Sequence, residues 1–561
     1  MLRIFLSLLM VWTSAAKALP VVQYGSPVNY EILLAGNFGE PRPNHFHGGV
    51  DVKTGGVEGK PIFSIGDGYV SHVTIGVGGF GNAVYVRHPE GYTSVYCHLK
   101  KFTPQIQAMV RKWQYEHKRA TGEMHFRTTD LPVAQGQLIA VSGNTGSSQA
   151  PHLHLEIHDT KTWHMLDPLD FIGQHVNDTV APRAHAFMAY PQEGRGVFCN
   201  SSSKQNYGFD SNDLKREFTA WGHVGFGLWA NDYMQKTYNH FGIRSMLLLV
   251  DDSLVFSSNV CDIPVEQNMQ VNTWGDYEHY LRNNVWYMRS YICPGVTLPI
   301  LTDRGAIIDF NEERPYRLTF KLTDFKGNTS EYHFTVNGMP TKLNGRRGKV
   351  SCFHGQLHRI SYDRHNSIQL PGLQMEVPPG KCAGTILLDP EVKHLAGALS
   401  DTYRLSPTSC PLYRHCSLSI LLKHAVADSS KLYVEGEWPT SRYCGGTFRK
   451  GWVTGFVRDL GQAYSLAYDD TPPTIQPLNA ETWGHSRNLR VKLSDGQSGL
   501  DHYEAYVDGQ FVLFEEIPKT QTYQCKLEQT PVKPTGRMRK FSLIAVDCRQ
   551  NRSQYTCQFM Y

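Results

Sequence analysis

Three short segments rich in histidine hold the side chains whose types and spacing could do chemistry. They are Asn44-His45-Phe46-His47-Gly48-Gly49-Val50-Asp51, Tyr96-Cys97-His98-Leu99 and Pro151-His152-Leu153-His154-Leu155-Glu156-Ile157-His158. Imidazole and carboxylate groups are zinc ligands, and a neutral imidazole is also a general base near neutral pH. Because the chain has 25 histidines, a chance motif is easy to find, and the spacing within each segment must decide.

The third segment alternates polar and apolar residues, which predicts a half-buried β-strand. Its two leucines and its isoleucine face the core, while its histidines and Glu156 share the other face. Neighbours on that face stand about 6.6 Å apart at the backbone, from a rise of about 3.3 Å per residue. One imidazole can then bind a metal ion while the next stands beside the metal-bound water. Taken alone, this segment fits a polar, solvent-facing strand equally well.

In the first segment, His47 and Asp51 are four residues apart, and a straight strand would separate them by roughly 13 Å. Gly48-Gly49 between them allows a local bend that brings both to one zinc ion. Two histidines and one aspartate leave a fourth position for water, which is the arrangement of catalytic zinc. His45 is a rival ligand, and it suits a supporting or surface position equally well.

The second segment predicts a strand that carries Tyr96 and His98 on one face and Cys97 on the other. Cys97 is therefore expected in the core rather than as a nucleophile. The chain has no HExxH, no GxSxG and no P-loop ending in GK[ST]. The glycine-rich stretch 76–81 is expected to be a β-turn rather than a phosphate-binding loop.

Together, and in this order, the three segments resemble the lysostaphin-type (LytM-type) zinc endopeptidases of peptidoglycan. That family carries H-x-x-x-D, then Y-x-H-L, then H-x-H, as in His47-Gly-Gly-Val-Asp51, Tyr96-Cys-His98-Leu99 and His152-Leu-His154 here. The stretches between them, such as 59–70 and 136–146, are similar as well. The resemblance covers about residues 25–172.

The resemblance implies that His47, Asp51 and His154 bind Zn²⁺ and that His152 and His98 are the catalytic pair. One of the pair would accept a proton from the zinc-bound water and the other would stabilise the oxyanion; which does which stays open. Three features depart from the family. Residues 100–133 form a longer link than usual and contain an expected helix. Some members have a tyrosine shortly before the first ligand, for which Arg42 is the candidate substitute. The usual glycine before Pro-His-x-His is Ala150 here.

Most of the chain reads as short strands separated by Gly, Asn, Asp and Pro turns. One helix is expected, with Thr103 as N-cap, Pro104 at its first position and an end near Gly122. The expected fold class is therefore mainly β: an antiparallel β-sheet, lysostaphin-like peptidase domain with one inserted helix, followed by immunoglobulin-like β-sandwich domains.

A weak internal repeat supports the sandwiches. Residues 324–332 match 547–555 in spacing, and Asp178-Thr-Val-Ala-Pro182 resembles Asp470-Thr-Pro-Pro473. The two Asp-x-x-x-Asn stretches favour hairpin turns over calcium loops. The expected domains are a signal peptide at 1–18, a lysostaphin-like metallopeptidase domain at 19–176, and sandwiches at 177–340, 341–468 and 469–561.

Composition bounds the compartment and the partners. The chain of 561 residues is 41% hydrophobic and 19% charged, which excludes wholesale disorder, and its net charge of +4 gives no reason to expect a nucleic-acid partner. Residues 1–18 resemble an export signal cleaved after Ala18, and no other stretch is long enough to span a membrane. Twelve cysteines fit an oxidising compartment, and some are expected to pair. We expect export to the periplasm or the extracellular envelope.

The leading hypothesis is an exported zinc endopeptidase that hydrolyses peptide bonds in the cross-links or stems of peptidoglycan. A non-catalytic LytM-type envelope scaffold or activator is the first alternative, and the complete set of five site residues disfavours it. A secreted peptidase acting on Gly-rich proteins is the second, which only substrate assays can separate. The C-terminal sandwiches would bind an envelope protein or a glycan, or act as spacers.

Overall fold

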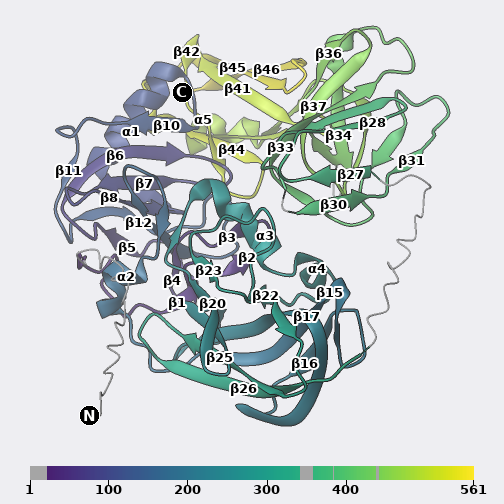
Figure 1. The fold of residues 1–561 in the computed structure, drawn as a ribbon. Coiled ribbons are helices and arrows are strands. Elements are labelled where there is room, and N and C mark those ends of the chain that lie inside the picture. Colours follow the sequence, from purple (N-terminus) through teal and green to yellow (C-terminus); the bar gives the residue numbers. More distant parts are fainter. Residues whose placement is uncertain (1–21, 342–357, 383, 438–440) are drawn as a thin grey trace, which may run out of the picture.

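The computed structural model describes residues 22–341, 358–382, 384–437 and 441–561 (Figure 1). The expected signal peptide lies outside this part of the chain. About half of the described residues are in strands, which pair antiparallel with few exceptions, and this confirms the mainly β fold class. None of the described helices has the length and hydropathy to cross a membrane. They are α1 (Pro104–His117), α2 (Leu169–Ile172), α3 (Val271–Trp274), α4 (Tyr277–Asn283) and α5 (Trp483–Ser486).

The N-terminal module (22–176) is built on a sheet of strand order β1-β4-β13-β8-β7-β6-β10. Its strands are β1 (Leu34–Gly36), β4 (Val50–Lys53), β6 (Gly68–Ile75), β7 (Ala83–Arg87), β8 (Tyr92–Cys97), β10 (Gly122–His125) and β13 (His152–Asp159), with β11 (Pro132–Val133) and β14 (Met165–Leu166) beside them. Smaller sheets join β5 (Pro61–Phe63), β12 (Leu138–Val141) and β9 (Lys101–Phe102), and β2 (Pro41–Arg42) with β3 (His45–Phe46).

Strand β13 runs through the centre of this sheet. Its apolar side chains are fully buried in the core, as their alternation predicts. Its other face is buried as well, rather than turned to solvent, because the ring of Phe80 lies against His154 and that of Trp163 stacks on His158. Water therefore has little access to the hydrogen-bonding atoms of the polar side chains on this face of β13.

Helix α1 begins at Pro104 after Thr103, as the sequence predicts. It ends at His117, earlier than expected, because Lys118 adopts a left-handed conformation with φ 51°. Gly122 instead opens β10, which pairs with β6. A side chain at Gly122 would collide with the Trp113 ring, since a Cβ there would lie 2.2 Å from it.

The second module (177–341) is an eleven-stranded sheet in which the long β17 pairs with β15 over one half and, in parallel, with β26 over the other. The sheet thereby closes over an aromatic core that includes Phe187, Phe226 and Phe334. Its strands are β15 (Arg183–Phe198), β16 (Gln205–Gly208), β17 (Asp213–Tyr233), β18 (His240–Phe241), β19 (Ser245–Val250), β20 (Ser253–Asn259), β22 (Met288–Arg289), β23 (Leu301–Asp303), β24 (Ile308–Phe310), β25 (Pro315–Thr323) and β26 (Thr329–Gly338).

The third module (358–468) has two five-stranded sheets and a two-stranded sheet of β27 and β30, which enclose one core. The C-terminal module (469–561) has two four-stranded sheets around a core of its own. The third contains β27 (His358–Ser361), β28 (Asn366–Leu370), β29 (Leu373–Val377), β30 (Thr385–Leu388), β31 (Glu391–Lys393), β32 (Thr402–Arg404), β33 (Pro411–Leu421), β34 (Leu432–Glu437), β35 (Ser441–Tyr443), β36 (Thr447–Arg449), β37 (Trp452–Asp459) and β38 (Ala463–Tyr468). The C-terminal module contains β39 (Thr474–Leu478), β40 (Asn488–Ser494), β41 (Leu500–Val507), β42 (Gln510–Phe511), β43 (Glu515–Ile517), β44 (Thr522–Lys526), β45 (Met538–Asp547) and β46 (Arg552–Met560).

The two Asp-x-x-x-Asn stretches form the same turn in the second and C-terminal modules. Asp324 accepts backbone N–H bonds from Lys326 and Asn328 between β25 and β26. Asp547 does the same for Arg549 and Asn551 between β45 and β46. The predicted hairpin turns are thus confirmed.

The N-terminal and second modules share cores across their junction. Phe241 of β18 is buried in the core of the N-terminal module, while Phe38 and Phe46 are buried in that of the second module. The sheet also continues across the boundary, since β14 pairs with β21 (Asp262–Ile263). Arg244 forms an ion pair with Asp167 beside this contact.

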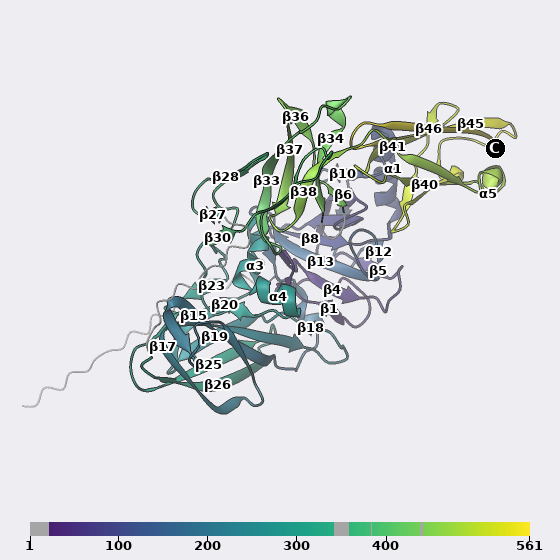
Figure 2. The ribbon, with the colours of Figure 1, turned by 90° about the vertical axis from the view of Figure 1, so that its right-hand side faces the viewer.

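The C-terminal module folds back against the N-terminal module at α1 (Figure 2). Arg111 of α1 pairs with Glu515 at 3.2 Å although 404 residues separate them. Lys519 donates to the side chain of Asn144 at 3.1 Å and to the carbonyl of Ser148. The last contact lies four residues before His152.

Eleven of the twelve cysteines lie in the described part, and all eleven are free thiols there. The expected disulfide pairing is therefore not seen among them; Cys352 lies outside the described residues. Cys97 is fully buried, as predicted, and burial raises the pKa of its thiol. A protonated, buried thiol is a core group rather than a nucleophile.

The shared junction predicts that one side chain of the second module stabilises the N-terminal module. Phe241→Ala removes a ring that is 1% exposed and should lower the free energy of unfolding by about 3–5 kcal/mol. Thermal or denaturant unfolding of the full chain measures this. Tyr238→Ala, at a fully exposed ring three residues away, is the matched control and should leave the midpoint unchanged. Equal midpoints for the two variants would contradict the shared core.

Candidate metal centre

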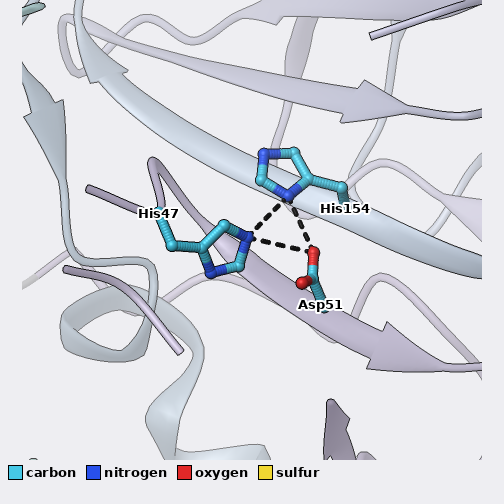
Figure 3. A group of neighbouring side chains, drawn as sticks. All are labelled: His47, Asp51 and His154. Carbon is cyan, nitrogen blue, oxygen red and sulfur yellow. Dashed lines mark hydrogen bonds and ion pairs between the residues drawn. The ribbon is translucent and has the colours of Figure 1, made fainter. Parts of the chain in front are cut away.

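The site forms where β4 and β13 run side by side. The antiparallel register places Asp51 directly opposite His154, so that the two side chains share one face of the sheet. His47 reaches the same point from the segment that leads into β4. Its Nε2 lies 3.0 Å from Asp51 Oδ1 and 2.9 Å from His154 Nδ1, and the latter two atoms are 2.8 Å apart (Figure 3). All three residues are buried.

Gly48 and Gly49 let His47 come this close, for a reason other than the predicted one. Neither glycine adopts a positive φ, so the bend does not need glycine's dihedral freedom. Both are needed for space. A Cβ at Gly49 would lie 2.2 Å from the Leu155 carbonyl, and one at Gly48 would lie 2.6 Å from the Glu156 carboxylate. The glycines allow the His47 segment to press against β13.

Hydrogen bonds on the far sides of the two rings decide which nitrogens face inward unprotonated. His47 Nδ1 lies 2.7 Å from the Asn37 carbonyl, which can only accept, so this nitrogen carries the proton. His154 Nε2 lies 2.9 Å from Glu156 Oε1, and the adjacent histidines hold the pKa of Glu156 well below its usual range although burial opposes this. The inward-facing atoms are therefore two imidazole lone pairs and a carboxylate oxygen.

Such a donor set fits a metal ion. Three electron-pair donors about 3 Å apart repel one another unless a proton or a metal ion lies between them. Ligand atoms around tetrahedral zinc lie about 3.3 Å apart, from bonds near 2.0–2.1 Å, so the observed spacings need only a small expansion. The buried carboxylates already favour positive charge here: burial lowers the pKa of His154, but Asp51 and Glu156 raise it to about 9 overall.

His152 and His98 stand beside this group. His152 Nδ1 donates to the Ala150 carbonyl at 2.8 Å, while His152 Nε2 lies 3.3 Å from Asp51 Oδ1. His98 Nδ1 donates to the Thr145 carbonyl at 2.9 Å in the same way. The two rings are 4.8 Å apart between centroids. Both histidines thus turn Nε2 away from their carbonyl anchors.

His98 does not continue the strand as the sequence pattern predicts. β8 ends at Cys97, and His98 turns into a left-handed conformation with φ 59°. The backbone N–H of His98 donates to the carbonyl of Phe80, which lies in the loop between β6 and β7. This bond holds the chain where it turns away from β8. Burial, and then the neighbouring positive histidines, lower the pKa of His98 to about 4. A left-handed backbone conformation, which is uncommon for residues other than glycine, thus directs the His98 ring toward His47, Asp51 and His154, called the metal group below.

The structure also shows where His45, Arg42 and the glycine-rich stretch lie. His45 is exposed, bonds the Pro43 carbonyl and lies outside the ligand group. Arg42 contacts the metal group directly, because its guanidinium donates to Asp51 Oδ2 at 2.9 Å. The glycine-rich stretch forms the predicted β-turn, in which Gly81 N–H donates to the Gly78 carbonyl.

Glu156 and Asn37 support the site, and the motifs did not identify either of them. Glu156 accepts from His154 at 2.9 Å and from His158 at 2.6 Å. The Asn37 side chain exchanges two 2.8 Å hydrogen bonds with the Gly242 backbone of the second module, which fixes the carbonyl that orients His47. Glu156 was visible as the next polar residue on the face of β13. Asn37 had no sequence signal, because its role comes from its carbonyl.

Comparisons with known proteins identify the family of the N-terminal module. Residues 45–115 match the model of peptidase family M23, and residues 357–469 match a Zu5-like domain. An uncharacterized metalloprotease of Haemophilus influenzae is 36% identical over 20% of this chain and 18% of its own length. Lipoprotein NlpD of Yersinia enterocolitica is 31% identical over 18% of this chain and 80% of its own length. The chain belongs to peptidase family M23, a metallopeptidase family.

Two further proteins extend the comparison. Peptidoglycan DD-endopeptidase ShyA of Vibrio cholerae is 31% identical over 23% of this chain and 26% of its own length. The catalytic domain of lysostaphin from Staphylococcus simulans is 23% identical over 25% of this chain and 90% of that chain, with a TM-score of 0.19. The chain spans about a fifth of the length of the Haemophilus relative.

The contact between Glu156 and His154 predicts that this carboxylate tunes metal affinity. Glu156→Gln keeps the size of the side chain but removes the charge that orients the His154 ring, and should weaken Zn²⁺ binding roughly 10- to 100-fold. Competition with a chromophoric chelator measures the affinity. Glu116→Gln, on the exposed face of α1, is the control and should bind as the wild type does. Unchanged affinity in Glu156→Gln would remove Glu156 from the site.

Proposed function

We propose that the chain is an exported zinc endopeptidase that hydrolyses peptide bonds in peptidoglycan cross-links or stems. One observation carries the proposal: the inward-facing lone pairs of His47 and His154 meet the Asp51 carboxylate, with His98 and His152 beside them. In this proposal the first three residues bind the zinc ion and the other two act on the substrate and the proton.

Zinc in a site of this kind lowers the pKa of a bound water and polarises the carbonyl of the scissile bond. We assign proton transfer to His152, because its Nδ1 is anchored on the Ala150 carbonyl and its Nε2 points into the site, 3.3 Å from Asp51 Oδ1. A neutral His152 would accept the proton at Nε2 and, once protonated, would give it to the leaving amine. We assign His98 to the oxyanion: its Nε2 would donate there once the developing negative charge has raised the lowered pKa of His98 enough for the ring to take a proton from solvent.

The proposed substrate class comes from a relative. ShyA is named as a peptidoglycan DD-endopeptidase and is 31% identical over 23% of this chain. The envelope location follows from the export signal expected at residues 1–18. We also propose that the segments 177–340, 341–468 and 469–561 are separate β domains that contact envelope proteins or glycans around the peptidase domain.

The alternative is a non-catalytic envelope scaffold of the same family. It would use the same fold without hydrolysis. The presence of both His98 and His152, each with its Nδ1 anchored on a carbonyl, favours the enzyme, because hydrolysis needs groups that move a proton and stabilise the oxyanion, whereas a scaffold needs neither.

Digestion of purified peptidoglycan tests the proposal. The zinc-loaded full chain should release defined fragments by peptide-bond cleavage, identified by mass spectrometry. A chelator should abolish cleavage and added zinc should restore it. His152→Ala should keep its zinc but cleave roughly 10²- to 10⁴-fold more slowly.

Two histidine variants separate metal binding from chemistry. His47→Ala should lose zinc as well as activity, whereas His45→Ala, outside the ligand group, should retain one zinc per chain. A folded, zinc-loaded chain that releases nothing from several wall types would replace the enzyme with the scaffold. Cleavage of Gly-rich proteins but not of peptidoglycan would show that the substrates are Gly-rich proteins instead.

A further inference from the structure

A second group of converging oxygen atoms lies where the N-terminal module meets the second module. Asp178, Asp232 and Asp324 each place a carboxylate oxygen within 4.8 Å of the others, and each residue is at most 6% exposed. Asp178 directly follows the N-terminal module, Asp232 lies near the end of β17, and Asp324 begins the turn between β25 and β26. Three segments distant in sequence thus bring three acids into one buried space.

Two of these carboxylates are incompletely satisfied. Asp178 Oδ2 and Asp232 Oδ1 are buried and have no hydrogen-bond partner. The ammonium of Lys326, in the same turn, donates to the Gly173 carbonyl instead. Burial and the neighbouring carboxylates raise the pKa of Asp232 to about 8 and that of Asp178 to about 6. Buried carboxylates are retained when they are paired or bind a metal ion.

The C-terminal module contains a matched group that is complete without a cation. Asp469, Asp495 and Asp547 converge in the same way, with Asp547 in the equivalent hairpin turn. Asp469, rather than the Asp470 expected from the repeat, takes the place of Asp178. There, Ser498 donates both its N–H and its hydroxyl to Asp469 Oδ2, and Thr471 N–H donates to Oδ1. Among described residues, no oxygen of this group is buried without a partner.

We propose that Asp178, Asp232 and Asp324 bind one calcium ion, which ties the first residues of the second module, where the chain leaves the N-terminal module, to β17 and to the turn between β25 and β26. The donor set is all oxygen, which suits a hard cation rather than zinc. Oxygens bound to one Ca²⁺ at 2.3–2.6 Å can lie up to about 5 Å apart, which accommodates the observed spacing. Mg²⁺ retains several waters and is usually bound through one or two carboxylates, so a group of three carboxylates favours Ca²⁺. This site is independent of the proposed peptidase activity.

Calcium titration of the zinc-loaded full chain in calcium-free buffer tests the proposal. Native mass spectrometry should show one Ca²⁺ per chain, and the melting temperature should rise by about 5 °C or more at a hundredfold excess over Kd. Asp232→Asn should bind Ca²⁺ at least tenfold more weakly. Its calcium-free melting temperature should equal or exceed that of the wild type, because repulsion among the carboxylates is relieved. A merely damaged fold would lower it.

Asp495→Asn is the matched control in the C-terminal group and should bind Ca²⁺ as the wild type does. If Asp232→Asn does not fold, Asp178→Asn supplies the same comparison. A wild-type chain that binds no Ca²⁺ overturns the proposal, since the group would then hold a proton instead. Equal Ca²⁺ affinity in the aspartate variants, or the same thermal shift with Mg²⁺ at equal concentration, overturns it as well.

Discussion

Three electron-pair donors cannot occupy one buried space unless a positive charge lies between them, and the N-terminal module is arranged around this constraint. The register of β4 and β13 sets Asp51 opposite His154, and two glycines remove the atoms that would keep His47 away. The backbone carbonyl of Asn37 and the carboxylate of Glu156 then hold the proton of each ring on its outer side. The strand register, the two glycines and the outer hydrogen bonds therefore act together to bring the same three donor atoms to one point.

The sequence predicted those parts of the site that depend on local spacing. Alternation along residues 152–158 is a property of the strand itself, so the shared face of His152 and His154 follows directly. The turn at His98 was not predictable from its neighbours, because it depends on a hydrogen bond to Phe80 on another segment. The role of Asn37 was invisible because any residue has a carbonyl. Partners that come from elsewhere in the fold leave no periodic trace.

The modules show the same division between local and distant information. The repeated Asp-x-x-x-Asn stretch predicted two hairpin turns, and both are present. The same motif did not reveal how the surroundings of the two turns differ. One turn faces two carboxylate oxygens that have no hydrogen-bond partner, whereas near the other turn Ser498 donates to the neighbouring carboxylate. Likewise, nothing in the local sequence of β18 indicates that Phe241 is buried in a neighbouring module.

The second module helps to position the three proposed metal ligands. The segment that carries His47 is held at both ends by this module. At one end Gly242 fixes the Asn37 side chain; at the other, Asn268 accepts the Phe46 N–H at 2.6 Å, and the Phe46 ring packs against Trp274. Because His47 is the ligand that lies outside the central strands, it is the one that most needs this support. The position of the metal group therefore depends on a contact about 200 residues away in sequence, as well as on the sheet that carries Asp51 and His154.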